Sequence, residues 1–318
     1  MFKYIIKRLL LLIPVMLATT FLIFLAMNLS AGDYVSTIES DTMTDADREA
    51  LREELGLNDS VFVQYGRFVY KLVFKGDLGT SLSTQTSVMQ IFKDRIGATM
   101  YLGICATFVS WIIGIPLGIL AAKHPGSLVD NACNLVGTVG LATPNFWLGL
   151  LLIVLFSVKL HWLPSNDNKY WYSVIMPAIT IGTGNTANLM RITRSALIEN
   201  SHMDYCRTAR SKGVSERVVF NKHAMRNALI PIIHDSVGLL ALCIGGAALT
   251  ESVFSWPGVG TMILEGMRAR DTTLTCGLMT MKCFLIALLI LVEDVIYVFI
   301  DPRLKTMYAS SRRSKKSE

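Results

Sequence analysis

The stretch that decides the fold is DYCRTARSKGVSERVVFNKHAMRNALIP, which runs from Asp204 to Pro231. It is dense in Arg and Lys, and it leads directly into an apolar span. The rest of the chain is mostly apolar: hydrophobic residues make up 52% of its 318 residues, charged residues only 17%, and the mean hydropathy is +0.46. Because soluble domains carry about 25% charged residues, this composition indicates a membrane protein.

Apolar stretches long enough to cross a bilayer recur along the chain. A helix needs about 20 apolar residues for one crossing, and six stretches meet this length or come close to it. They are residues 9–29, 98–122, 132–158, 173–190, 228–250 and 277–300. The first is too long for the apolar region of a cleaved signal peptide, so we expect it to be retained. The sequence therefore predicts an all-α membrane protein with six transmembrane helices.

Basic residues fall on one side of the membrane if the six spans alternate. The segment before the first span, the second-to-third and fourth-to-fifth connections and the tail together hold 18 of the 30 Lys and Arg residues. Lys and Arg accumulate in cytoplasmic loops, so we expect both termini and the opening stretch in the cytoplasm. This also explains the net charge of +6 without nucleic acid, since no aromatic residues interleave with the basic ones.

The predicted topology divides the chain into four parts. They are an N-terminal transmembrane helix (1–29), an extracytoplasmic segment (30–97), a five-helix core (98–300) containing the basic loop 191–227, and a basic cytoplasmic tail (301–318). In the external segment, TDADREALREELG predicts an amphipathic helix that Thr44 caps and Gly56 ends. This segment lacks a catalytic constellation, so we expect a small external cap or docking surface.

The basic loop reads as two helices separated by a glycine. Good helix formers run from Tyr205 to Lys212, Gly213 is a natural stop, and Ser215 can begin a second helix that feeds the fifth span. A basic loop attracted to anionic lipid at about 1 kcal/mol per residue explains the charge. It does not explain the break at Gly213 and the immediate restart, which indicate a short helix exposed to the cytosol.

Motifs that carry chemistry are missing from the sequence. There is no GxxxxGK[ST] to cradle nucleotide phosphates, no HExxH and no GxSxG. The six cysteines and five histidines show no metal-ligand spacing. We therefore expect no catalytic residue, no metal site and no cofactor in this chain. Charges inside the spans are sparse, which argues against a secondary transporter that works without ATP, and no residue pair indicates a membrane-embedded enzyme.

The RTARSKG stretch resembles the cytoplasmic signature loop of ABC-importer permeases, and more closely its version in the oligopeptide/dipeptide/nickel family. GIPLGILAA, TPNFWLGLLLIVLFS, ESVFSWPGVG and DPR are also similar to that family, in the same order. The long external segment after the first span is typical of its first (B-type) permease subunit. One departure is AGD at Ala31–Asp33, where the family often has PGDP. The resemblance implies the type I ABC importer permease fold in a bacterial plasma (inner) membrane.

The resemblance also implies function and partners. The chain would form half of a translocation path for di- or oligopeptides, with nickel or a metal chelate as the alternative cargo. Its partners would be a homologous second permease, cytoplasmic ATP-binding subunits that bind ATP and Mg, an extracytoplasmic substrate-binding protein and membrane lipid. The loop would be the coupling helix that docks on the ATPase. Its residues would be Tyr205, Arg207, Thr208, Ala209, Arg210, Lys212 and Gly213.

A second candidate site lies in the ESVFSWPGVG stretch. We expect a turn with Trp256 at the membrane interface. Glu251, Trp256, Pro257 and Gly258 would form part of an outer gate, and plain anchoring by the tryptophan is the alternative. Two further expectations concern the spans. Gly103, Gly114 and Gly118 allow close helix approach, and Pro116 and Pro144 kink spans two and three.

Overall fold

The computed structural model describes residues 2–30, 32–38, 43–166 and 168–300. Within these ranges every regular element is a helix, and the only bridge between extended residues is an isolated one from Thr80 to Ser87. This confirms the predicted all-α class. The chain divides into two units: unit 1 comprises residues 1–100 and 247–287, and unit 2 comprises residues 101–246 and, among the described residues, 288–300.

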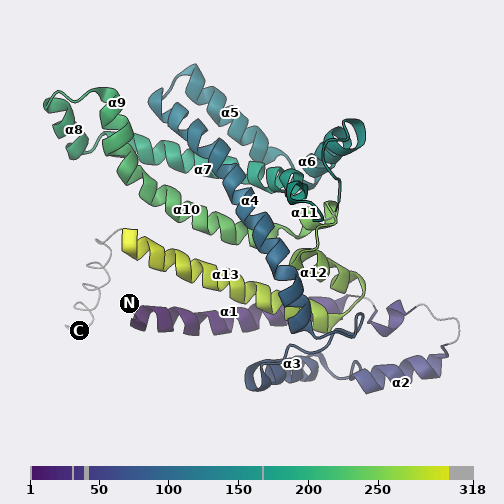
Figure 1. Cartoon of the computed structure of the whole chain (residues 1–318). Helices are drawn as coiled ribbons and strands as arrows, with labels where there is room; N and C mark the ends of the chain where they lie inside the picture. The colour runs from purple at the N-terminus through teal and green to yellow at the C-terminus, as the bar shows by residue number, and fades with distance from the viewer. Residues whose placement is uncertain (1, 31, 39–42, 167, 301–318) are drawn as a thin grey trace, which may run out of the picture. The chain divides into compact units, whose positions relative to one another are not determined.

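Unit 1 consists of two stretches of the chain, residues 1–100 and residues 247–287. Its helices are α1 (Phe2–Leu29), α2 (Asp45–Leu55), α3 (Val61–Lys75), the start of α4 (Val88–Lys123), α11 (Ala248–Val253), α12 (Val259–Arg268) and the first part of α13 (Thr272–Ile300) (Figure 1). Apolar side chains from α4, α12 and α13 form its main core. The buried members are Leu78, Val88, Ile91, Phe92, Val259, Met262, Ile263, Leu274 and Leu278.

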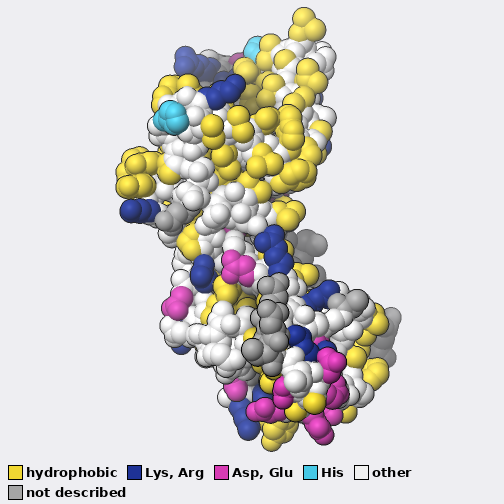
Figure 2. Space-filling view, turned by 90° about the vertical axis from the view of Figure 1, so that its right-hand side faces the viewer, with side chains coloured by type: hydrophobic (Ala, Val, Ile, Leu, Met, Phe, Trp, Pro, Cys, Tyr) yellow, Lys and Arg dark blue, Asp and Glu magenta, His cyan; other side chains and the backbone are white. Residues whose placement is uncertain are grey.

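The capping signals predicted for α2 are confirmed. Thr44 accepts a hydrogen bond from the Asp47 amide, and the Asp47 carboxylate accepts one from the Thr44 amide, which is a reciprocal capping box. Gly56 ends the helix at φ +66°, in the left-handed region that favours glycine. The first turn of the helix carries Asp45 and Asp47, and Figure 2 shows acidic side chains gathered on one part of the surface.

Unit 2 is built around α7. Its elements are the rest of α4, α5 (Leu128–Ala142), α6 (Asn145–Leu152) with a π-helical extension to Lys159, a 3-10 turn (Trp171–Val174), α7 (Ile175–Ser201), α8 (Asp204–Ser211), α9 (Glu216–Val218), a π-helical turn (Val219–Ala224), α10 (Met225–Gly246) and the end of α13. α5, α6 and α10 all pack on α7, as Figure 1 shows.

Glycines of α4 permit close packing on α7, as expected for Gly114 and Gly118. A Cβ on Gly118 would lie 2.6 Å from the Cβ of Thr193, and one on Gly114 would lie 3.0 Å from the carbonyl oxygen of Thr186. Gly103 lies against Ile244 of α10 in a looser contact of 3.2 Å. The backbones approach so closely that a side chain at Gly118 would force α4 away from α7.

A buried ion pair joins α5 to α7. Arg194 donates to both carboxylate oxygens of Asp130, from Nε at 2.7 Å and from Nη2 at 2.6 Å. The same carboxylate accepts the Gly126 amide, and Asp130 is 3% exposed. In the sequence, Arg194 belongs to the basic loop 191–227. In the structure its guanidinium binds the Asp130 carboxylate with two parallel hydrogen bonds and so connects α7 to α5.

In the part of the chain that the structure describes, four helices are long and apolar enough to cross a membrane: Leu10–Leu29, Val88–Lys123, Glu216–Gly246 and Thr272–Glu293. A fifth crossing results if the bent pair Leu128–Ala142 and Asn145–Lys159 counts as one span. This pair bends by 93° at Thr143–Pro144, which confirms a break at Pro144. The predicted span 173–190 lies in α7, and the count of six stays a prediction. The predicted basic tail lies outside the described residues.

Candidate functional site

The predicted helix–glycine–helix segment (residues 204–224) folds as two short helices joined by a tight turn. α8 ends at Ser211, and Gly213 follows at φ +79°. The amides of Gly213 and Val214 donate to the carbonyl groups of Arg210 and Ala209 and so close the helix end. A residue with a Cβ is strained in this left-handed conformation, which explains the glycine. Ser215 is the N-cap residue of α9, but its side chain makes no capping hydrogen bond.

The underside of α8 is apolar and buried. Cys206 and Ala209, three residues apart on the helix, pack against Val219 and Ala224, with Val214 beside them. Burial raises the pKa of the Cys206 thiol, so this thiol is a packing group at neutral pH. The small cluster fixes α8 onto the π-helical turn that precedes α10.

Arg210 ties the segment together by polar contacts. Its Nε and Nη2 donate to the two carboxylate oxygens of Glu216, at 2.5 and 3.2 Å, and its Nη1 donates to the carbonyl oxygen of Ser201 at 2.9 Å. These hydrogen bonds to Glu216 raise the pKa of the guanidinium. One side chain thus connects α8 with the end of α7 and the start of α9.

The opposite face of α8 is exposed. Tyr205, Arg207, Thr208 and Lys212 all lie on the surface, and the side chain of Arg207 is 70% exposed. Among the described residues, its ion-pair contact is a long one of 3.8 Å with Asp204, whose side chain is itself almost fully exposed. The seven predicted coupling residues therefore divide by role: buried Ala209 and the contacts of Arg210 hold the helix in place, Gly213 forms the turn, and the other four present exposed side chains.

The structure adds a basic groove that the sequence analysis did not single out. It has a volume of about 640 Å³ and is lined by Tyr205, Lys222, His223, Arg226, Asn227 and Ile230. Lys222 and His223 lie on the π-helical turn (Val219–Ala224). π-helical turns inside α-helices are frequent at functional sites. The hydrophobic periodicity of the sequence does not show where such a turn occurs, so the groove was not predicted.

The second predicted site is a turn organised by a buried carboxylate. Glu251 is fully buried, and its Oε1 accepts a hydrogen bond from Thr99 Oγ1 at 2.8 Å while its Oε2 accepts the Thr261 amide at 3.0 Å. Thr99 in turn accepts the Val259 amide. The carboxylate thus links α11, the turn, the start of α12 and α4 within unit 1.

Glycines leave the space that this carboxylate occupies. A Cβ on Gly258 would lie 2.3 Å from the Glu251 carboxylate, and one on Gly260 would lie 2.7 Å from its Oε2. The PGVG sequence is therefore required for packing on Glu251 as well as for the turn. Lys282 of α13 is 7% exposed and is near enough to interact electrostatically with Glu251.

Trp256 packs inside unit 1 and not on its surface, and its expected depth at the membrane interface stays a prediction. The indole is 1% exposed inside unit 1, and its Nε1 donates to the carbonyl oxygen of Ala98 at 3.0 Å. The Trp256 amide also donates to the Glu251 carbonyl oxygen. Trp256 is thus a core residue of the turn, because its apolar ring and its donor both find partners within the unit.

Neither site has the arrangement of a catalytic centre. The segment 204–224 offers exposed cations on a rigid base, and the Glu251 turn uses its polar groups in internal hydrogen bonds. Among the described residues, no group of three or more His, Cys, Asp or Glu side chains is placed to hold a metal ion. The geometry supports contact with a partner at α8 and mechanical linkage at the Glu251 turn.

Two family models together cover most of the chain. The model described as "Binding-protein-dependent transport system inner membrane component" matches residues 114–306, and its N-terminal companion matches residues 1–103. The chain belongs to this family. It is therefore the membrane component of a transport system, as the resemblance in its sequence motifs predicted.

Curated relatives extend over nearly the whole chain. The oligopeptide transport system permease protein AppB of Bacillus subtilis is 35% identical, covering 96% of this chain and all of the relative. The dipeptide transport system permease protein DppB of Alkalihalophilus pseudofirmus is 36% identical, covering 96% and 100% of the two chains. DppB of Escherichia coli is 33% identical over 96% of this chain and 99% of its own.

Solved structures support the fold. A chain of the inward-facing MetNI methionine ABC transporter aligns with a TM-score of 0.56 and 18% identity, covering 67% of this chain and 97% of that chain. A second crystal form gives a TM-score of 0.58. The predicted importer-permease fold is thus confirmed.

Proposed function

We propose that this chain is one of two permease subunits of an ABC importer that carries peptides. The exposed face of α8 carries the proposal: four surface side chains stand on a helix that an apolar cluster and the Arg210 contacts hold in place. A helix that transmits force from a partner has to be short, exposed on one face and rigidly supported on the other. The segment 204–224 meets these three conditions.

The partners follow from this role. Cytoplasmic ATPase subunits bind and hydrolyse ATP, and their closure pulls α8 toward its counterpart on a homologous second permease. α9 and the π-helical turn are continuous with α10. Because packing and the Arg210–Glu216 contact hold α8 on this segment, the movement reaches a membrane-crossing helix as a rigid-body shift. Both termini and the segment 204–224 lie in the cytoplasm, and a substrate-binding protein delivers the cargo from outside.

The Glu251 turn acts in this scheme on the outer side. Its buried hydrogen bonds join α11, α12 and α4, so a movement of one helix is transmitted to the others. Glu251, Trp256, Pro257 and Gly258 therefore hold an outer gate together from within unit 1. The curated names of the relatives favour peptides as cargo over nickel or a metal chelate.

A co-purification experiment tests the proposal. The complete transporter would be purified through a tag on this chain, comparing the wild type with an Arg207→Ala/Lys212→Ala double variant. Because both side chains are exposed, the variant will fold, and we expect several-fold less ATPase subunit and a matching loss of peptide uptake. Lys93→Ala, an exposed cation of unit 1, is the matched control. Unchanged ATPase retention together with unchanged uptake contradicts the proposal.

A further inference from the structure

Helix α7 has a polar face, although the sequence analysis assigns its first part to a membrane span. Asn185, Asn188 and Arg191 recur at three-residue spacing, which places them on one side of the helix. Asn188 and Arg191 are exposed, whereas Leu189 and Met190 between them are fully buried. α7 is also less apolar than α1, α4, α10 and α13. Polar side chains on one face of a helix at membrane depth are typical of a helix that borders a water-filled cavity.

Helix α10 places two titratable side chains near the middle of the membrane. It forms the end of the crossing helix Glu216–Gly246, in which Arg226 is the last Lys or Arg. Asp235 lies between Arg226 and Gly246, roughly 14 Å from the first and 17 Å from the second at a rise of 1.5 Å per residue, and His234 precedes it. Because the hydrocarbon core is about 30 Å thick, both side chains lie where a titratable group is costly and indicates a functional site.

Hydrogen bonds connect these side chains to two other helices of unit 2. Asn188 Nδ2 of α7 donates to Asp235 Oδ1 of α10 at 3.0 Å. His234 Nδ1 lies 3.1 Å from Glu293 Oε1, and Glu293 belongs to the part of α13 that is assigned to unit 2. Asn188 and His234 are both exposed. The four residues, Asn188, Asp235, His234 and Glu293, therefore form a polar strip that reaches the surface of the unit.

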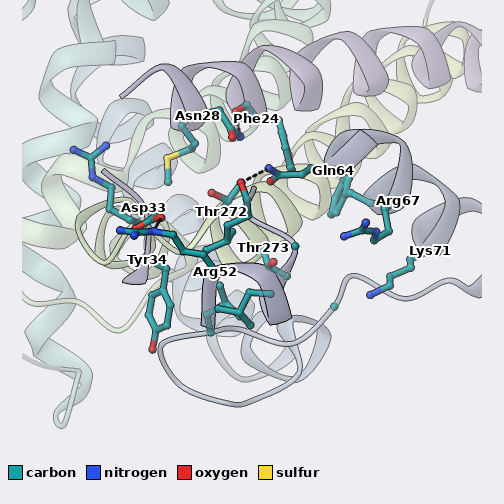
Figure 3. Close-up of a pocket in the computed structure, with 18 of the residues that line it drawn as sticks. Phe24, Asn28, Asp33, Tyr34, Arg52, Gln64, Arg67, Lys71, Thr272 and Thr273 are labelled. Atoms are coloured by element: carbon teal, nitrogen blue, oxygen red, sulfur yellow. Dashed lines mark hydrogen bonds and ion pairs between the residues drawn. The ribbon is translucent and has the colours of Figure 1, made fainter. Parts of the chain in front are cut away.

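One oxygen of the polar strip lacks a partner. Asp235 Oδ2 is buried and accepts no hydrogen bond in the part of the chain that the structure describes. Carboxylates elsewhere are matched: Asp33 pairs with Arg52 at 2.6 Å in the pocket of unit 1 shown in Figure 3, and Asp130 pairs with Arg194. Because a buried acceptor without a donor destabilises the fold, a ligand that donates to Asp235 Oδ2 would complete the site.

The surroundings of the polar strip favour water over lipid. On α4, Ile104, Phe108 and Ile112 form an apolar row at four-residue spacing, and each is more than half exposed. This row fits the hydrocarbon tails of lipids. The polar strip does not, because its exposed side chains would lose their hydrogen bonds to water there. Unit 2 thus presents an apolar surface on α4 and a polar one across α7, α10 and α13.

We propose that the polar strip lines the translocation path and that Asp235 binds the protonated amino group of the cargo. The inference rests on the proposed function and deepens it, since a peptide carries an ammonium group at its N-terminus. The strip holds two carboxyl groups and one imidazole, a balance that attracts a cation. Arg191, the cation of the same α7 face, donates instead to Thr138 Oγ1 of α5 at 3.4 Å. The ammonium group donates to Asp235 Oδ2, the oxygen that has no partner.

Thiol labelling tests the path and its charge. The assembled transporter with Asn188→Cys is placed in nanodiscs and treated with a cationic or an anionic methanethiosulfonate reagent, and mass spectrometry follows the peptide that contains position 188. We expect reaction several-fold faster with the cationic reagent, and loss of this preference when Asp235→Asn is added. Ile112→Cys, in the apolar row of α4, is the matched control and should not react. No reaction at position 188, or equal rates for the two reagents without Asp235→Asn, overturns the proposal.

Protection by peptide tests the cargo assignment. Because nanodiscs leave both sides of the membrane accessible, millimolar trialanine reaches the path without a binding protein. We expect trialanine to slow the labelling of Asn188→Cys at least threefold, and acetyl-trialanine, which has no ammonium group, to leave it unchanged. Equal protection by both peptides, or by neither, overturns the role of Asp235. Uptake of trialanine by the wild type in proteoliposomes is measured in parallel, and its absence contradicts the proposed function instead.

Discussion

The guanidinium of Arg210 and the carboxylate of Glu216 meet across the Gly213 turn, with two hydrogen bonds of 2.5 and 3.2 Å. The pair fixes the angle between α8 and the helix that continues into α10. Because both side chains are exposed to solvent, the pair adds little to the stability of the fold. Its main effect is therefore on the rigidity of the segment 204–224 and not on folding.

Breaking the Arg210–Glu216 pair should reduce peptide uptake without preventing the ATPase subunits from binding. We expect Arg210→Ala to lower peptide uptake several-fold while the ATPase subunits still co-purify, because the exposed residues Arg207 and Lys212 are unchanged. Exchanging the charges, with Arg210→Glu and Glu216→Arg together, should recover part of the uptake. Uptake is measured in proteoliposomes. A double exchange as inactive as Arg210→Glu alone would show that the pair does not act through this contact.

Substitution of Gly258 should destabilise the Glu251 turn. In Gly258→Ala the new methyl group would overlap the Glu251 carboxylate at 2.3 Å, and overpacking of this kind costs about 1–3 kcal/mol. We expect a fall of several degrees in the thermal unfolding midpoint of the purified complex. Gly246→Ala is the matched control, since a Cβ there meets nothing within 4 Å. If Gly258→Ala and Gly246→Ala had the same thermal unfolding midpoint, the turn would accommodate the new methyl group without loss of stability, which would contradict the prediction.

Removal of the Asp130 charge should affect the tether between α5 and α7. Asp130→Asn leaves Arg194 without its carboxylate, and because the Arg194 side chain is 28% exposed, the cost is smaller than the roughly 3–5 kcal/mol of a fully buried pair. We expect lower yield of folded protein and earlier thermal unfolding. Asp204→Asn removes a carboxylate whose side chain is 98% exposed and should have no measurable effect. If Asp130→Asn and Asp204→Asn unfolded at the same temperature, the Arg194–Asp130 ion pair would not stabilise the packing of α5 on α7.

Acidification should loosen α2 through Asp33. Burial acts to raise the pKa of Asp33, but hydrogen bonds from Arg52 and from the Ser36 amide outweigh it and hold the pKa below 3.8. Since the folded state has the lower pKa, this contribution to stability is present above about pH 4 and is lost as pH falls further. Hydrogen exchange of the α2 amides, corrected for the intrinsic rate, should rise below pH 4. Asp33→Asn should show no such rise.

Local signals in the sequence predicted local structure well. Thr44, Gly56 and Gly213 lie where the capping rules place them, because a helix end depends on only a few neighbouring residues. Pro144 indicated a break in the third span for the same reason. Its angle of 93° depends on how α5 and α6 pack against α7, which no local pattern contains.

Contacts between distant residues were not predictable. Glu251 binds Thr99, 152 positions away in the sequence, so its role in the turn could not be read from ESVFSWPGVG alone. Trp256 was assigned to the interface because tryptophan is common there, yet the indole is buried inside unit 1 and donates to the carbonyl oxygen of Ala98, 158 positions away. The same limit applies to α3, which lies in the segment expected to be polar and external, yet its Tyr65 packs on Phe21 and Phe24 of α1 and donates to the carbonyl oxygen of Leu17.

The central claim is that the exposed face of α8 lies inside the cell and contacts an ATPase subunit. A photo-crosslinker in place of Thr208, irradiated in intact cells, tests it most directly, because Thr208 is exposed. The account predicts a covalent adduct with the ATPase subunit and no reaction of a Thr208→Cys variant with a membrane-impermeant thiol reagent added outside. Labelling of Thr208→Cys from outside, with no ATPase adduct from the crosslinker, would contradict it.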